Sequence, residues 1–244
     1  MRLTRIFTPQ ELHNDAVVAL EPEPSRHIAR ALRMSLGDAL TLFDGRGGEY
    51  PAVITALERH TVTVRTGERQ PGLAESPLAV QLGIAVSRGE RMDWVMQKAT
   101  ELGVAVIAPL GSEHCTVKLS AGRADKKQRH WQQIVNSACE QSGRCDIPQV
   151  QPITALRQWL NTTDAQRKFI LDPGVSASQF GAAVRRVALL VGPEGGFSAA
   201  ELEAARAAGF QALRLGPRVL RTETAPLAAI ALLQARWGDM QAGD

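Results

Sequence analysis

The stretch LLVGPEGGFSAAE, Leu189–Glu201, decides the fold class, because it passes from an apolar strand through a glycine-rich turn into a helix. Ser198, followed three residues later by Glu201, forms a capping box, and Gly209 ends the helix that begins there. The predicted unit is strand, loop and helix. Such a loop at the carboxyl end of a sheet strand often binds a ligand, and a plain structural turn is the alternative.

The loop Gly-Pro-Glu-Gly-Gly has neither of the usual phosphate-binding signatures. It lacks the G-x-G-x-x-G spacing of dinucleotide sites and the Gly-Lys-Ser/Thr of P-loops. Glu194 would also repel a phosphate unless a metal ion intervened, whereas a neutral or cationic ligand would be tolerated. These features argue against a nicotinamide-dependent oxidoreductase, which is the first rival interpretation.

Composition excludes several classes of protein. The chain has 244 residues and a net charge of +3, with a pI near 9.0. Cys115, Cys139 and Cys145 form no C-x-x-C pair, which argues against a disulfide framework and a zinc site. The start lacks an apolar signal core, and the longest apolar run, Ala225–Leu233, is far shorter than the roughly 20 residues of a membrane span. We therefore expect a cytoplasmic protein with no metal site and no membrane partner.

The sequence changes from short strands to alternating strands and helices near residue 70. The expected strands of the first part lie at 17–20, 39–43, 49–57 and 61–66, with one short helix at 25–34. Gly67–Pro77 is rich in glycine, proline and polar residues, as linkers are. After it, strands alternate with helices, among them 91–103 and 124–142, which is typical of a mainly parallel α/β sheet. The predicted division is a small antiparallel sheet or barrel at 1–70, a linker at 71–77 and an α/β domain at 78–244.

A second loop near the carboxyl end repeats the design of the first. Leu213–Leu233 consists of a strand, a Gly-Pro loop and a helix with Pro226 in its first turn. Because neighbouring parallel strands end at one edge of a sheet, the loops Gly192–Phe197 and Gly216–Thr224 should line one crevice. Their glycines let backbone groups approach a ligand. The apolar last helix should bury more than one face, in the core or against a second subunit.

The two loops carry a family resemblance. GPEGGFS followed by LGPRVLRTETA resembles the paired signatures of the SPOUT class of S-adenosylmethionine (SAM)-dependent RNA methyltransferases. It resembles most the RsmE family, which methylates N3 of a uridine in bacterial 16S ribosomal RNA. SRGERMDWVMQKATELGV, ALRM, FDG and CEQSGR also resemble that family, so the likeness covers nearly the whole chain. His114 departs from it, because relatives commonly carry Arg after Glu113, and Leu171–Val175 matches only loosely.

The resemblance implies a fold, a cofactor and partners. The fold is a PUA-like β-barrel that binds RNA, followed by a parallel α/β domain with a trefoil knot, a rare topology. The cofactor is SAM, and the partners are 16S ribosomal RNA within the 30S subunit and a second copy in a homodimer, with the cofactor cleft at the interface. Another SPOUT activity, such as ribose 2'-O methylation, and a non-catalytic RNA-binding factor with the same fold are alternatives.

The resemblance also implies the site residues. The expected cofactor contacts are Leu171, Leu190, Gly192, Gly195, Gly196, Leu215, Gly216, Leu220, Arg221, Thr222, Thr224 and Ala225. Arg221 and Arg88 are candidates to stabilise negative charge on the uracil oxygens. Uridine N3 must lose a proton before it attacks, and Glu223, Glu194 and Glu140 are candidates to accept it.

Basic residues outside the loops are the expected RNA contacts. Arg26, Arg30 and Arg33 are spaced i, i+4 and i+7, so in a helix they would share one face and could follow a phosphate backbone. An ordinary solvated face is the alternative. The other expected contacts are Arg5, Lys118, Lys126 and Arg144. For Arg144 an intrahelical ion pair with Glu140 is an equal alternative.

Overall fold

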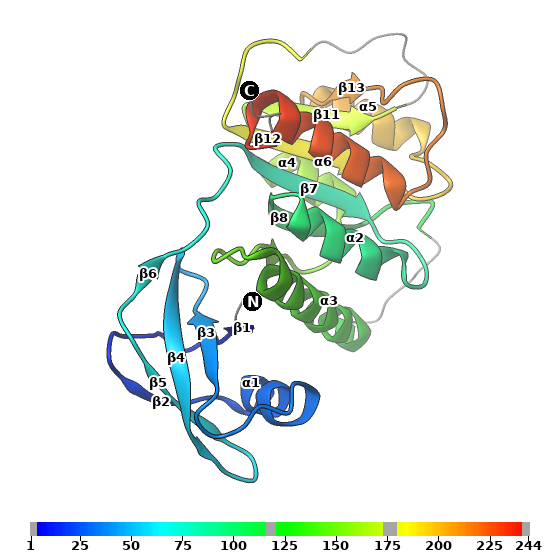
Figure 1. The fold of residues 1–244 in the computed structure, drawn as a ribbon. Coiled ribbons are helices and arrows are strands. Elements are labelled where there is room, and N and C mark those ends of the chain that lie inside the picture. The colour runs from blue at the N-terminus through cyan, green and yellow to red at the C-terminus, as the bar shows by residue number, and fades with distance from the viewer. Residues whose placement is uncertain (1–3, 116–120, 173–179, 241–244) are drawn as a thin grey trace. The chain divides into compact units, whose positions relative to one another are not determined.

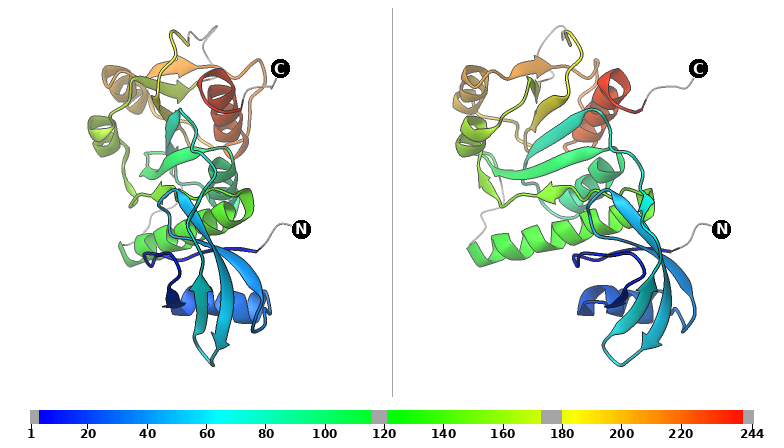
Figure 2. Two further views of the ribbon diagram at one scale, coloured as in Figure 1. Left: turned by 60° about the vertical axis from the view of Figure 1, so that its left-hand side comes forward. Right: turned by 90° about the vertical axis from the view of Figure 1, so that its left-hand side faces the viewer.

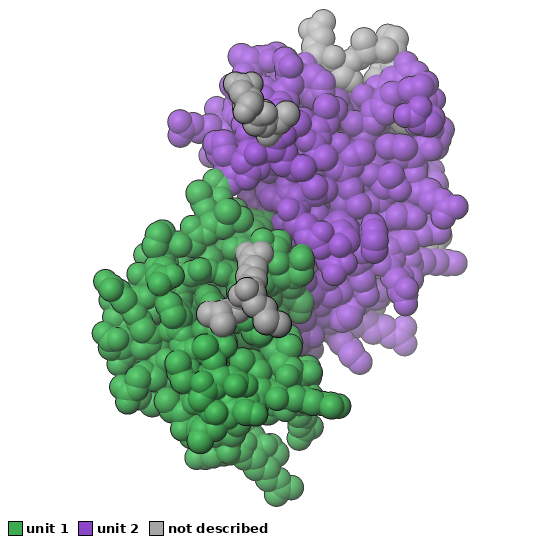
Figure 3. Space-filling model, in the orientation of Figure 1, with its two compact units in different colours: residues 1–75, 136–147 green, residues 76–135, 148–244 purple. Residues whose placement is uncertain are grey.

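The computed structural model describes residues 4–115, 121–172 and 180–240, and the chain divides into two compact units (Figures 1 and 3). Unit 1 comprises residues 1–75 and 136–147, and unit 2 comprises residues 76–135 and 148–244. The division after Glu75 falls inside the predicted linker. Residues 136–147, however, belong to unit 1 and not to the α/β domain as predicted, because their side chains bond to the amino-terminal strands.

Unit 1 is built on a six-stranded sheet with the order β1-β3-β4-β5-β2, in which β6 pairs with β4. Its strands are β1 (Arg5–Phe7), β2 (Val17–Ala19), β3 (Ala39–Phe43), β4 (Gly48–Leu57), β5 (Val62–Thr66) and β6 (Gln70–Pro71). The β1–β3 pair is parallel and the other pairs are antiparallel. The four predicted strands are confirmed as β2 to β5, whereas β1 and β6 are too short to show an alternating pattern.

The strands of unit 1 bury one face in an apolar core. Leu40 and Leu42 of β3 lie in it with Tyr50 and Ile54 of β4, because alternate side chains of a strand point to the same side. The hydroxyl of Tyr50 donates a hydrogen bond of 3.0 Å to the carbonyl of Leu12, so this buried polar group is satisfied.

The helix predicted at 25–34 is present only in part. α1 (Pro22–Arg26) is α-helical, but η1 (His27–Ala31) is a π-helix, and Arg33 beyond it has a left-handed φ of 52°. The helical segment ends before Arg33, so Arg33 does not continue the face that an i, i+4, i+7 spacing would give. The predicted helical face therefore does not include all three arginines, although all three are exposed.

Unit 2 contains a seven-stranded sheet in which every pair is parallel, with the order β10-β8-β7-β12-β11-β13 and β9 beside β8. Its strands are β7 (Ala79–Ala85), β8 (Val104–Gly111), β9 (Gln149–Val150), β10 (Thr154–Ala155), β11 (Arg167–Leu171), β12 (Arg186–Val191) and β13 (Gln211–Leu213). The predicted parallel α/β domain is confirmed.

Helices cover both faces of this sheet (Figures 1 and 2). They are α2 (Arg91–Glu101), α3 (Ala121–Ser142), α4 (Leu156–Thr162), α5 (Ala199–Ala207) and α6 (Thr224–Trp237). α4 and α5 pack on one face, where Trp159 lies among Leu190 and Phe210, and α2 and α6 lie on the other. Because both faces are buried, the central strands β7 and β12 are apolar almost throughout.

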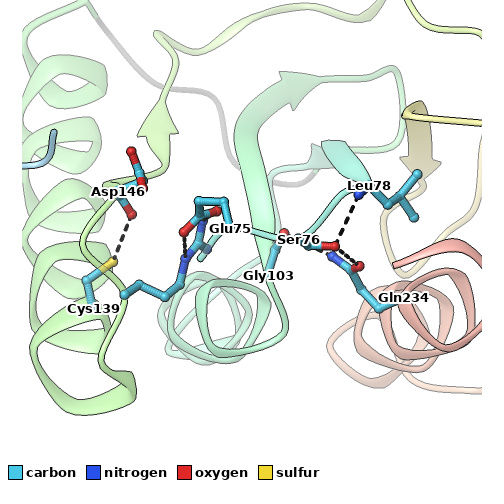
Figure 4. A network of polar contacts seen from close by, with 8 residues as sticks. Glu75, Ser76, Leu78, Gly103, Cys139, Asp146 and Gln234 are labelled. Atoms are coloured by element: carbon cyan, nitrogen blue, oxygen red, sulfur yellow. Dashed lines mark hydrogen bonds and ion pairs between the residues drawn. The ribbon is translucent and has the colours of Figure 1, made fainter. Parts of the chain in front are cut away.

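A polar network inside unit 2 fixes α6 (Figure 4). Ser76 Oγ donates to Gln234 Oε1 at 2.6 Å and accepts from the amide of Leu78 at 3.2 Å. Gln234 Nε2 donates to the carbonyl of Gly103 at 3.1 Å. Gly103 follows the end of α2 with a φ of 83°, and a Cβ there would lie 2.8 Å from Gln234. The buried Gln234 thus links α6 to the residues before β7 and after α2.

The last helix buries one face within this chain, because its buried residues recur at the i, i+3, i+4, i+7 spacing of a single helical stripe, so the prediction that it buries more than one face is not confirmed. Pro226, Ala229, Ile230 and Leu233 of α6 are buried, whereas Leu232 is 38% exposed. In the ranges that the structure describes, no helix combines the length and the apolar character needed to cross a bilayer.

Candidate functional site

Two loops at the carboxyl edge of the parallel sheet meet in one pocket. Gly192–Phe197 follows β12, the segment 214–223 follows β13, and the end of β11 lies between them because β11 pairs with both strands. The pocket has a volume of about 350 Å³, and all three segments contribute to its lining. The expectation that the two loops line one crevice is confirmed.

Most of the predicted cofactor contacts line this pocket. They are Leu171, Gly192, Gly196, Leu215, Gly216, Leu220, Thr222 and Ala225. Leu190 is fully buried in the core beside α4 and α5, and Gly195, Arg221 and Thr224 are not part of the lining. The lining residues that were not predicted as contacts are Asp172, Val191, Pro193, Glu194, Phe197, Leu202, Leu213, Arg218 and Val219. Most of these residues lie inside the two loops quoted above. Including every residue of each loop would therefore have predicted them.

The capping box fixes the end of the first loop. The amide of Glu201 donates to Ser198 Oγ at 3.2 Å, and the amide of Ser198 donates to Glu201 Oε2 at 2.9 Å. Glu201 Oε1 accepts from the amide of Glu113 at 2.8 Å. The Glu201 residue is only 4% exposed, so its carboxylate anchors the start of α5 to the segment that follows β8. A negative charge in the first turn also suits the helix dipole.

His114 contacts the backbone of the same loop. Its Nδ1 lies 3.2 Å from the carbonyl oxygen of Gly195 and 3.1 Å from that of Gly196. Two carbonyl acceptors require that Nδ1 carries the proton. Gly196 has a φ of 69°, and a Cβ on Gly195 would approach His114 Cβ to 3.3 Å. Sequence comparison marked His114 only as a departure from its relatives, whereas the structure makes it a donor to the loop.

A charged cluster joins the two loops. Arg91, the first residue of α2, pairs with Glu194 of the first loop, and its Nε lies 3.7 Å from Glu223 Oε2 of the second. Arg88 and Glu194 line one hollow together with Arg91, while Glu223 and Arg91 line another. Arg91 was not predicted, and its place in the motif SRGER was the available hint. It contacts the candidate proton acceptors Glu194 and Glu223 and lines the same hollow as Arg88.

Arg221 lies at the start of the last helix. Its carbonyl accepts from the amides of Thr224 and Ala225, both at 2.9 Å, which starts the first turn of α6. Its side chain is exposed and is not part of the pocket lining. The lining does not support the predicted contact of Arg221 with the cofactor, and its assignment to the uracil oxygens stays a prediction.

The pocket suits a small ligand with apolar surface. Leu171, Leu220 and Phe197 give it apolar walls, and the charged residues Asp172, Glu194 and Arg218 also line it. Glu194 is paired with Arg91, so the charge of the lining does not by itself select a cation over a phosphate. The volume falls within the roughly 300–1,000 Å³ of small-molecule sites, and the apolar walls are those expected of a site for a small organic cofactor.

Two arginines predicted to contact RNA are buried in unit 1. The Arg5 side chain, 6% exposed, pairs with Glu49 and donates from Nη2 to the carbonyl of Arg144 at 3.2 Å. The Arg144 side chain, also 6% exposed, donates from Nε to Glu75 Oε1 at 3.0 Å. Arg144 lies beyond the end of α3, so it lacks the helical geometry of the alternative pair with Glu140. The predicted RNA contacts of Arg5 and Arg144 are therefore wrong, because carboxylates of unit 1 already pair with both guanidinium groups.

Glu140, a predicted candidate to accept the N3 proton, belongs to unit 1. Its Oε1 accepts from the amide of Phe7 at 3.0 Å, and its Oε2 lies 3.9 Å from His27 Nδ1. Burial raises the pKa of Glu140, and the Phe7 hydrogen bond partly opposes this. The carboxylates that the structure places at the loops are Glu194 and Glu223.

The cysteines form no catalytic or metal site within the described residues. All three are free thiols, and Cys139 Sγ donates to the carbonyl of Asp146 at 3.8 Å (Figure 4). Burial raises the pKa of Cys139 to about 12, so this thiol stays protonated at neutral pH. No group of three or more His, Cys, Asp or Glu residues in the described chain is placed to hold a metal ion.

The remaining predicted RNA contacts that the structure describes are exposed. Lys126 lies on α3, and Arg26, Arg30 and Arg33 lie on the helical segment of unit 1 and just after it. Lys118 lies outside the described residues. These assignments stay predictions.

Known families match both parts of the chain. A family described as an RNA methyltransferase domain matches residues 74–234, and one described as an RNA methyltransferase PUA domain matches residues 20–66. The ribosomal RNA small subunit methyltransferase E of Buchnera aphidicola subsp. Schizaphis graminum is 35% identical over 98% of each chain. The protein of that name from Bacillus subtilis is 30% identical over 93% of each chain.

Solved structures agree with these matches. The ribosomal RNA small subunit methyltransferase E of Neisseria gonorrhoeae, bound to S-adenosyl methionine, has 40% identity and a TM-score of 0.90, covering 98% of this chain and all of that chain. A putative methyltransferase from Legionella pneumophila in complex with SAM has 42% identity and a TM-score of 0.95, with the same coverage. The chain, with a PUA domain ahead of an RNA methyltransferase domain, therefore belongs to the ribosomal RNA small subunit methyltransferase E family.

Proposed function

We propose that this chain transfers the methyl group of SAM to N3 of a uridine in 16S ribosomal RNA of the small subunit. The observation that carries this is the pocket formed by Gly192–Phe197 and the segment 214–223, in a chain whose 40% identical relative binds SAM. Such a substrate implies a cytoplasmic enzyme.

The pocket is the proposed cofactor site. When bound, SAM supplies an electrophilic methyl group on a cationic sulfur. Apolar walls at Leu171, Leu220 and Phe197 exclude water, and the backbone at Gly192 and Gly216 can approach closely because neither carries a side chain. Holding the two reactants in line in this way can supply about 7–11 kcal/mol of the barrier.

Glu223 is the proposed acceptor of the uridine N3 proton. Thr222 and Ala225 on either side of it line the pocket, so its carboxylate lies where a second reactant would approach the methyl donor. Arg91 holds this carboxylate at 3.7 Å. Arg221 and Arg88 would donate to the uracil oxygens as negative charge develops there, which is where fixed donors accelerate a reaction most.

The other parts of the chain would present the RNA. We propose that the sheet of unit 1 closes as a PUA-like barrel, and that Arg26, Arg30, Arg33 and Lys126 contact phosphates. For unit 2 we propose the trefoil knot and a homodimer that covers the exposed part of α6. The position of β11 between β12 and β13 supports the knot, since the chain must return across β11 to form it.

Calorimetric titration with SAM, with NAD as the control, tests the cofactor. Saturable binding of SAM alone is expected, and binding of NAD would overturn the assignment. The second step is methyl transfer to unmodified small ribosomal subunits, read by reverse transcription. A methyl group on N3 blocks the pairing edge and stops the polymerase at one uridine. Methylation of a ribose would favour another SPOUT activity, and RNA binding without methyl transfer would favour a non-catalytic factor.

A further inference from the structure

One tryptophan stands apart from the others. Trp94 on α2 is 53% exposed, whereas Trp131, Trp159 and Trp237 are 1%, 2% and 9% exposed. Lys98, one turn along the helix, places its Nζ 5.3 Å from the centroid of the Trp94 ring and pairs with Glu101 at 2.7 Å. Of the four tryptophans, Trp94 therefore offers the largest exposed aromatic surface.

Trp94 forms one wall of a hollow of about 680 Å³ within unit 2. The other polar walls are Glu90, Arg91, Asp93, Gln97 and Glu223, and Ile134 adds an apolar one. Asp93 is already engaged, since it accepts from His130 Nε2 at 2.9 Å and from Trp131 Nε1 at 3.1 Å. The hollow therefore combines a flat aromatic surface with a carboxylate acceptor and a guanidinium donor.

The residues that line the hollow favour some kinds of ligand over others. Three carboxylates against one guanidinium would repel a phosphate. An apolar helix of another protein would bury these charges without partners, which is costly. A nucleobase suits every wall, because its face stacks on an aromatic ring and its edge offers both N–H donors for a carboxylate and carbonyl acceptors for arginine.

The hollow also adjoins the proposed site of methyl transfer. Arg91 lines it and pairs with Glu194, which lines the cofactor pocket. Glu223 lines it as well, and its neighbours Thr222 and Ala225 line the cofactor pocket. An unstacked base held here would lie next to the methyl donor.

We propose that a nucleobase of the RNA substrate stacks on Trp94, with its polar edge toward Arg91 and Glu223. This inference rests on the proposed function, because it takes ribosomal RNA as the substrate. It adds a base-binding residue on α2 that none of the loop motifs contains. Trp94 acts by holding the unstacked base, which offsets the cost of removing it from the RNA.

The test compares Trp94→Ala with Trp94→Phe, using unmodified small ribosomal subunits as substrate. Loss of the stacking surface should raise the KM for subunits about 5- to 150-fold in the alanine variant, while phenylalanine should retain the KM within about threefold. The dissociation constant for SAM should be the same in all three proteins. Gln133→Ala, an exposed change on α3 outside the hollow, is the control and should leave the KM unchanged.

Two further measurements distinguish base stacking by Trp94 from a purely structural role of this residue. Sedimentation velocity should give the same oligomeric state for the wild type and both variants. A change of that state in Trp94→Ala would overturn the proposal, because it would mean that a second copy of the chain covers the ring. An unchanged KM in Trp94→Ala would also overturn it. If the wild type binds SAM but does not methylate the subunits, the proposed function itself fails, and that outcome is distinct from either of these.

Discussion

Two arginines of unit 1 and one arginine at the start of α6 in unit 2 differ in burial. Arg5 and Arg144 are buried against Glu49 and Glu75, whereas Arg221 stands exposed at the start of α6. In sequence all of them look like cations available to RNA. The comparison teaches that the partner brought by the fold, and not the residue type, decides whether an arginine stabilises the protein or binds a ligand.

The largest effect should come from breaking a buried pair. Glu49→Ala leaves the Arg5 charge without its carboxylate in a site where the side chain is 6% exposed. We expect the free energy of unfolding to fall by about 3–5 kcal/mol, measured by urea denaturation. The double variant Arg5→Met, Glu49→Leu should regain most of that stability because no charge is left buried. A loss below about 1 kcal/mol would mean that the pair behaves like a surface ion pair.

The exposed arginine should matter to turnover and not to stability. Arg221→Ala removes a proposed donor to the uracil oxygens, so kcat should fall about 10²–10³-fold, as for an oxyanion donor. The SAM dissociation constant, measured by calorimetry, should be unchanged because Arg221 is not part of the pocket lining. Arg185→Ala, at an exposed position just before β12, serves as the matched control. An unchanged kcat in Arg221→Ala would reject the role.

An exposed arginine of unit 1 gives the intermediate case. If Arg30 contacts a phosphate, Arg30→Ala should weaken binding to small subunits several-fold and lower the slope of log affinity against log salt by about 1. Filter binding at several salt concentrations measures both quantities. Arg59→Ala, an exposed change between β4 and β5, is the comparison. Equal slopes for Arg30→Ala and the wild type would assign this arginine to an ordinary solvated surface.

The smallest effect is expected at Glu140, a largely buried carboxylate of unit 1. Burial raises the pKa of Glu140, so the folded chain holds this proton more tightly than the unfolded chain. The free energy of unfolding should therefore fall as the pH rises from the ordinary carboxyl range through the raised pKa. Glu140→Gln keeps an acceptor for the Phe7 amide and should flatten that part of the pH profile. The variant is compared with the wild type at each pH. A profile that is unchanged by the substitution would contradict the expectation.

The loops were predictable because their signals are local. A capping box needs only Ser198 and Glu201, and an apolar run needs only its own residues to predict a buried strand. Parallel strands then place their loops at one edge, which brought Gly192–Phe197 and Gly216–Thr224 together as expected. Leu190 was assigned to the ligand because a strand buried on both faces does not reveal which side chains face the core.

Local signals in the sequence were enough to predict the longer strands, most helices, the parallel sheet and the position of the pocket loops, because periodicity, caps and glycines act over a few residues. The folded structure was needed to show that residues 136–147 join unit 1 and that Arg91 links Glu194 to Glu223. Each of these depends on groups far apart in the chain. Their electrostatic and packing energies exist only once the backbone has brought them within contact distance.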